Sequence, residues 1–156
     1  ADPNEDTLYG VKPDPMRPGK HSIYMHTQPI MRASMSGNRA IMKLLLEAKA
    51  DANARVLDPT YQMPSLGALS FLSMKEDNAE CVRVLLEHRA DPNRVVLGGS
   101  EERSRATPLM DAASRGRERC LELLLDHGAR MDATLEDKAA STALSLATTG
   151  GHVACA

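Results

Sequence analysis

Large aromatic side chains are scarce in this sequence. Its 156 residues include no tryptophan, one phenylalanine and three tyrosines. Leucine, alanine, methionine and valine must therefore fill any core, which favours stacked helices over a sandwich packed around large rings. Because 42% of the residues are hydrophobic, the chain can still bury a core as one domain, and its composition is not that of a disordered protein.

The sequence also lacks a strong excess of either charge and any long hydrophobic run. It has 19 lysines and arginines against 21 aspartates and glutamates, for a formal net charge of −2, so we expect no nucleic-acid partner. No hydrophobic run approaches the ~18 residues of a membrane span, and residues 1–6 do not resemble a signal peptide. We therefore expect no direct insertion into a membrane.

Motifs that carry catalysis or bind cofactors are absent as well. The chain contains no GxxxxGK[S/T] phosphate loop, no GxGxxG, no HExxH and no GxSxG. Its histidines have no recognisable metal-ligand spacing. The absence of paired cysteines favours a reducing intracellular compartment, cytoplasmic or nuclear. We expect no enzymatic activity, no cofactor or metal, and no small-molecule substrate.

What the sequence does contain is an internal repeat. Three segments align without gaps, each with three consecutive aliphatic residues followed by an acidic one; they are residues 44–53, 84–93 and 123–132. A second shared segment lies upstream of each and recurs a fourth time; it begins at Pro29, Ala68, Pro108 and Ala143, at spacings of 39, 40 and 35 residues. Such a period indicates an array in which each unit buries its apolar side against its neighbours.

The third unit carries the clearest signature. Thr107-Pro108-Leu109 is followed by Gly116, by leucines at 123–125 and by Gly128-Ala129. This pattern resembles the ankyrin repeat, a unit of ~33 residues with a turn and two helices, and its register holds over four units from about residue 27 onward. The resemblance implies an all-α, helix-turn-helix repeat solenoid with extended finger loops.

On this register the chain divides into five parts. Residues 1–26 form the tail of a preceding repeat and a long proline-rich finger, residues 27–66 and 67–105 each form a repeat with a finger, residues 106–139 form a repeat, and residues 140–156 form a partial repeat. Both ends look cut, so we expect the chain to be part of a longer array. The alternative is a natural end that leaves the last helix frayed.

The second helix of each unit carries an apolar stripe that we expect to be buried. Its members are Ile41, Leu44, Leu45 and Ala48 in the first unit, Val82, Leu85 and Leu86 in the second, and Leu121, Leu124 and Leu125 in the third. All three cysteines, Cys81, Cys120 and Cys155, share the repeat position of Ile41. We therefore expect them to be buried, unpaired and structural.

The end of each second helix follows a pattern too. Gly128 suits a left-handed helix stop, and where Lys49 and Arg89 replace it we expect a small loss of stability. His88 and His127 share a position near the last carbonyl groups, which a donor or cation complements. We expect structural roles for both.

The few aromatic residues indicate where a partner binds. Tyr9, Tyr24 and Tyr61 lie in the turn insertions, and Phe71 lies on a first helix at the position of Arg32, Asp111 and Leu146. The resemblance implies that first helices and turn tips form a concave recognition surface, and aromatic residues are enriched at interface hot spots. The predicted contact residues are Tyr61, Met63, Phe71, Arg32, Met35, Asp111 and Arg115. The alternative is that the rings only pack against their own hairpins.

These observations predict a protein–protein interaction module, a scaffold or adaptor within a larger polypeptide or multi-subunit assembly, that binds its partner on the fingers and first helices. A second hypothesis makes the chain the targeting or regulatory domain of a larger enzyme or channel, with the activity outside these residues. No group of residues supports a third hypothesis, that the chain itself is an enzyme.

Overall fold

The described helices occur in pairs that repeat along the chain. The computed structural model describes residues 2–4, 28–54, 67–76, 78–95, 106–134 and 141–156. Within them the elements are α1 (Pro29–Met35), α2 (Arg39–Glu47), α3 (Ala68–Met74), α4 (Ala79–Glu87), α5 (Pro108–Ser114), α6 (Glu118–Asp126), α7 (Ala143–Thr149) and the 3₁₀ helix η1 (Val153–Cys155). No β-strand is found in this part of the chain.

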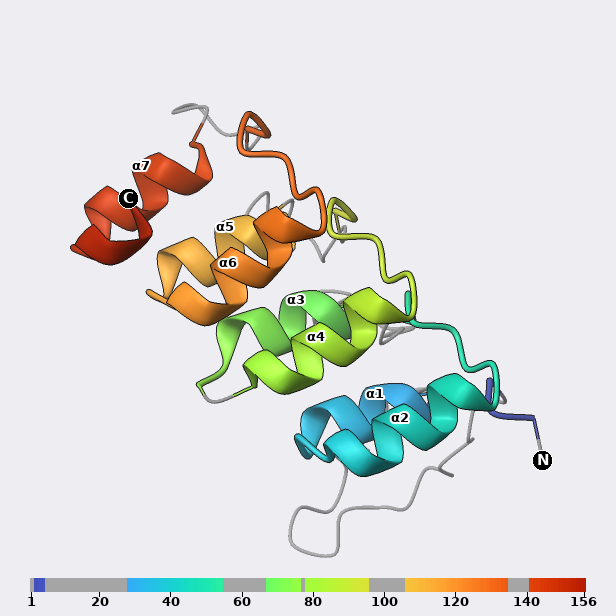
Figure 1. The fold of residues 1–156 in the computed structure, drawn as a ribbon. Coiled ribbons are helices and arrows are strands. Elements are labelled where there is room, and N and C mark those ends of the chain that lie inside the picture. The colour runs from blue at the N-terminus through green and yellow to red at the C-terminus, as the bar shows by residue number, and fades with distance from the viewer. Residues whose placement is uncertain (1, 5–27, 55–66, 77, 96–105, 135–140) are drawn as a thin grey trace, which may run out of the picture.

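The helices stack in two layers (Figure 1). Helices α1, α3, α5 and α7 pack side by side in one layer, and α2, α4 and α6 form the other. The short helix η1 lies against α6 and α7, as the second helix of a fourth unit does. The predicted all-α repeat solenoid is therefore confirmed for the described residues.

The first helices begin at the residues that the repeat signature predicts. Pro108 is the first residue of α5, where the missing backbone N–H has no helical partner to lose. The Thr107 side chain accepts a hydrogen bond of 3.3 Å from the Met110 N–H. Thr142 and Ser145 form a reciprocal capping box at the start of α7. Local sequence thus marks where α5 and α7 start.

The second helices end in left-handed backbone. The φ angles of Lys49, Arg89 and Gly128 are +70°, +65° and +85°, a region that costs a residue with a Cβ about 1–2 kcal/mol. The expected strain at the lysine and the arginine is therefore present. His88 and His127 directly precede Arg89 and Gly128. The Nδ1 atom of each imidazole donates a hydrogen bond to the carbonyl four residues back, at 2.9 and 2.8 Å. These histidines have the structural role predicted for them.

The core is aliphatic and lies between successive units. Its largest fully buried side chains include Ile30, Met31, Met42, Leu72, Leu85, Leu109, Met110 and Leu124. The hydroxyls of Ser34 and Ser73 are buried beside them, and each donates 2.8 Å to the carbonyl four residues earlier. These two buried hydroxyls are thus satisfied within their own helices.

The stripe predicted for α2 is wrong at three of its four positions; only Leu45 is half-buried against the core. Ile41 and Leu44 are 47% and 65% exposed, and Ala48 is exposed too, whereas Met42 and Leu46 are buried. The same positions are buried in the next unit, where Cys81 and Val84 are 4% and 5% exposed.

The reason lies in the direction that this position faces. Cys81 Sγ approaches the Gly37 carbonyl of the preceding unit at 3.6 Å, so the position contacts the unit before it rather than its own partner helix. No helix among the described residues lies on that side of α2. The stripes of α4 and α6 fit better, since Val82, Leu85, Leu86 and Leu124 are buried and Leu121 and Leu125 half-buried.

An asparagine at the end of each unit joins it to the next. The Asn53 side chain accepts 2.8 Å from the Asp91 N–H and donates 3.5 Å to the Arg89 carbonyl. Asn4 repeats the arrangement with the Asp51 N–H (2.7 Å) and the Lys49 carbonyl (3.2 Å). Asn93 repeats it with the Arg130 N–H (2.7 Å) and the Gly128 carbonyl (3.0 Å). Asn4 therefore contacts the first unit in the way that Asn53 contacts the second.

Candidate protein-binding face

One repeat position of the first helices is left largely out of the core. It is occupied by Arg32 on α1, Phe71 on α3, Asp111 on α5 and Leu146 on α7, of which Arg32 is exposed and the others half-buried. We call this position, together with Met35 and the helix-ending residues Lys75 and Arg115, the first-helix face. Met35 is 40% exposed, and Lys75 and Arg115 are exposed as well.

Phe71 and Lys75 form a fixed pair on this face. The Lys75 ammonium lies 4.6 Å from the centroid of the Phe71 ring, a cation–π distance. The same Nζ donates 3.4 Å to the Met35 carbonyl at the end of α1. Lys75 thus connects two neighbouring units while its charge stays at the surface.

Asp111 is the acid of the face, and its pKa is strongly shifted. Burial raises the pKa of its carboxyl from 3.8 to about 7, and the Ser70 hydroxyl and then the Arg115 guanidinium lower it only in part. Ser70 is 2% exposed, and its Oγ has no partner that meets hydrogen-bond geometry among the described residues. A half-buried carboxyl therefore lies beside a buried hydroxyl that has spare hydrogen-bonding capacity.

Charge is distributed unequally between the two layers. The first helices and the residues that end them carry Arg32, Lys75 and Arg115 against a single acid, Asp111. The second helices carry four basic and six acidic residues. The first-helix face is thus locally positive on a chain whose formal net charge is −2.

The predicted contact residues are only partly placed. Phe71 and Asp111 lie on the adjacent helices α3 and α5, Arg32 and Met35 lie on α1, and Arg115 ends α5. Tyr61 and Met63 lie outside the described residues, as do Tyr9 and Tyr24.

Lys75 was missed by the sequence reasoning. Its position four residues after Phe71 is the signal that could have found it, because residues four apart are neighbours along a helix.

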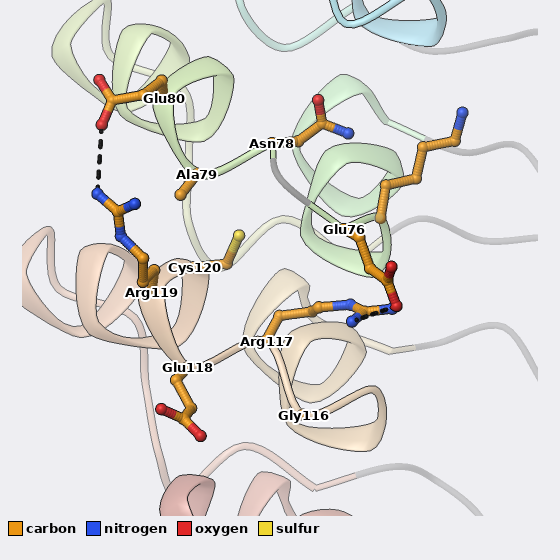
Figure 2. Close-up of a pocket in the computed structure, with 10 residues that line it drawn as sticks. Glu76, Asn78, Ala79, Glu80, Gly116, Arg117, Glu118, Arg119 and Cys120 are labelled. Atoms are coloured by element: carbon orange, nitrogen blue, oxygen red, sulfur yellow. Dashed lines mark hydrogen bonds and ion pairs between the residues drawn. The ribbon is translucent and has the colours of Figure 1, made fainter.

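A groove lies between the second and third units, apart from the first-helix face. It has a volume of about 530 Å³ and lies between the turn that joins α3 to α4 and the turn that joins α5 to α6. Figure 2 shows two ion pairs in it: Arg117 binds Glu76 at 3.0 Å, and Arg119 lies 3.6 Å from Glu80. Both pairs tie the second unit to the third.

The cysteines and His152 have structural surroundings. Cys81 and Cys120 are buried and Cys155 is half-buried, all with free thiols, and burial raises the pKa of each thiol. The predicted burial is confirmed for the first two. The His152 Nε2 lies 3.2 Å from the Ser114 carbonyl of the preceding unit, and its ring fills the space beside Gly116, where a Cβ would lie 2.5 Å from it.

The described residues contain neither a candidate metal site nor a membrane-spanning helix. No three of their histidine, cysteine, aspartate and glutamate side chains are grouped so that they could hold a metal ion. None of the helices in the described ranges has the length and hydrophobicity needed to cross a bilayer.

Comparison with known proteins agrees with this architecture. The family model of ankyrin repeats (3 copies) matches residues 69–156, more than half of the sequence. The chain therefore belongs to the ankyrin repeat family, whose members are generally non-catalytic modules of protein–protein interaction. A human relative, ankyrin repeat and SOCS box protein 2, is 36% identical over 92 residues, which are 57% of this chain and 13% of the relative. The chain thus spans about an eighth of that protein's length.

Proposed function

We propose that the chain is a scaffold or adaptor that binds a partner protein on its first-helix face and the adjoining fingers. The observation that carries this proposal is the chemical variety at one repeat position. The position holds a guanidinium, an aromatic ring, a carboxyl and an aliphatic chain in successive units, at Arg32, Phe71, Asp111 and Leu146. The next residue of each unit is buried in all four, as Ala33, Leu72, Ala112 and Ala147.

Such a face suits recognition rather than catalysis. Stacking of the helices fixes the backbone before any partner arrives, so little ordering entropy opposes binding. Phe71 is the one aromatic ring among the described residues, and half-buried aromatics serve as anchors in interfaces. The mechanism is complementarity of shape and charge.

A larger context is the second candidate. The name of the human relative joins ankyrin repeats to a SOCS box, and the match covers 13% of that protein. In this alternative the chain is the targeting or regulatory domain of a larger enzyme or channel, and any activity lies outside these residues. The first-helix face has the same role in both cases.

The test begins by identifying the neighbour through crosslinking and mass spectrometry on the native full-length protein. The affinity of the recovered partner is then measured for variants. Phe71→Ala with Tyr61→Ala should weaken binding at least about tenfold, as for a central aromatic anchor, with the helical circular dichroism unchanged.

The matched control lies on the second-helix layer. Arg83→Ala and Glu87→Ala remove exposed side chains of α4 and should leave the affinity unchanged. If these changes abolish binding while the aromatic changes do nothing, the partner binds the other layer and the proposal is wrong.

A further inference from the structure

We propose that the partner segment bound by the first-helix face is an acidic peptide with apolar side chains, and that Asp111 takes up a proton when this segment binds. The inference rests on the proposed function, because it specifies the chemistry of the partner at the same face. It follows from the arrangement of charge and from the position of one carboxyl.

Two positive charges of the face, those of Lys75 and Arg115, are available to a ligand. The exposed Lys75 ammonium contacts a ring and a carbonyl but no carboxylate of the described residues. Arg115 is exposed and lies in no ion pair with a described residue. Glu76, the nearest acid along the chain to Lys75, is held by Arg117 at 3.0 Å. Partner carboxylates would therefore meet cations that are not neutralised by ion pairs.

Apolar groups lie on the same face as these cations. Met35, Phe71 and Leu146 all present partly exposed apolar surface on the same face. A segment that alternates carboxylates with aliphatic or aromatic side chains would cover the apolar groups and pair with the cations. A basic segment would instead be repelled by Lys75 and Arg115.

Asp111 is the one group of the face that opposes such a partner. Of the helices packed on α5, neither α3 nor α7 contains an ionisable side chain. The ionisable residues of α6 are Glu118, Arg119, Cys120, Glu122 and Asp126, and none of them is among the groups that shift the Asp111 pKa. Arg115 is the charge that acts on it.

Protonation turns this obstacle into a contact. An ionised Asp111 repels a partner carboxylate, whereas a protonated Asp111 donates a hydrogen bond to it. The Ser70 hydroxyl stays beside the Asp111 carboxyl. Because the Asp111 pKa is already about 7, uptake of the proton costs little near neutrality. A bound carboxylate raises this pKa further, so the complex is favoured below neutral pH and weakens above it.

The experiment uses a displayed library of random histidine-free peptides, panned against the wild-type chain at about pH 6. We expect the recovered peptides to be rich in aspartate, glutamate and apolar residues. Their affinity for the wild-type chain should fall about tenfold between about pH 6 and pH 8, as the release of one proton allows. At about pH 8 the Asp111→Asn variant should bind the peptides as tightly as the wild type does at about pH 6. The affinity of this variant should not depend on pH.

Charge reversal supplies the matched control. Lys75→Glu and Arg115→Glu should each weaken binding at least about fivefold, whereas Arg83→Glu on α4 should not. Recovery of basic peptides, or an unchanged pH dependence in Asp111→Asn, would overturn the inference while leaving the face as the binding site. Peptides whose binding responds to Arg83→Glu and Glu87→Ala but not to Phe71→Ala would overturn the proposed function, and the inference with it.

Discussion

The carboxamide of Asn53 accepts a hydrogen bond of 2.8 Å from the backbone N–H of Asp91, which lies one unit further along the chain. Its amide group donates to the Arg89 carbonyl of that same unit, so a single side chain serves both a donor and an acceptor left by the end of α4. Asn53 is itself held in a turn, because its N–H donates 2.8 Å to Asp51 Oδ1. The units are therefore joined by polar contacts at this edge as well as by the core.

This arrangement makes Asn53 a stabilising residue at the protein surface. Asn53→Ala should lower the free energy of unfolding by about 1–2 kcal/mol, because it leaves two backbone groups without their partner. Asn78 is the control: it precedes α4 but its side chain makes no capping bond, so Asn78→Ala should cost less than about 0.5 kcal/mol. Denaturant midpoints at constant m-value measure both; equal costs would contradict the role assigned to Asn53.

Two leucines test which side of a second helix is buried. Leu85 is 0% exposed on α4 and Leu44 is 65% exposed on α2. Leu85→Ala should cost about 2–5 kcal/mol, because it leaves a cavity in the core. Leu44→Ala should change stability by less than about 0.5 kcal/mol. Chemical denaturation of both variants compares them directly, and a large loss at Leu44 would mean that another part of the chain covers it.

The sequence predicted the fold because the local signals agreed with the repeat. Thr107 and Pro108 mark the start of a helix by their own chemistry, and Gly128 marks a helix end by its φ of +85°. The exposure of Ile41 and Leu44 could not be predicted in this way. It depends on which unit stands on each side of α2, and helical periodicity does not contain that information.

The candidate site was predictable in outline only. The shared position of Phe71 and Asp111 follows from the repeat register. The pKa of Asp111 and the contact between Lys75 and Phe71 do not, because both depend on how α3 packs against its neighbours. Burial of the carboxyl beside Ser70 requires the distance between two units, which residue spacing along one unit cannot supply.

The left-handed residues at the ends of α2 and α4 should be improvable. Arg89 has a φ of +65°, so Arg89→Gly should raise the free energy of unfolding by about 1 kcal/mol through relief of backbone strain. Lys49→Gly should act in the same direction.

Gly128 provides the reverse experiment. A Cβ there would meet nothing within 4 Å, so Gly128→Ala tests the φ angle alone and should cost about 1 kcal/mol. Thermal unfolding at fixed pH follows all three variants. Destabilisation by Arg89→Gly would show that the arginine side chain contributes more than its backbone costs.

Asp111 should make the stability of the whole array depend on pH. In the unfolded chain its carboxyl titrates near 3.8, and in the folded chain near 7. Between these values the folded state retains a proton that the unfolded state has released, so the contribution of Asp111 to stability is largest below about pH 4 and is lost as the pH rises to about 7.

Asp111→Asn should therefore raise the free energy of unfolding at about pH 8 by about 1–3 kcal/mol relative to the wild type, with little effect below about pH 4. The amide keeps the shape of the carboxyl and cannot ionise, so the difference between the two proteins reports the buried charge. Asp126→Asn removes an exposed acid of α6 and should leave the pH dependence unchanged. Urea unfolding across this range measures the effect, and a stability difference between wild type and Asp111→Asn that does not grow with pH would show that the carboxyl is not held protonated in the folded chain.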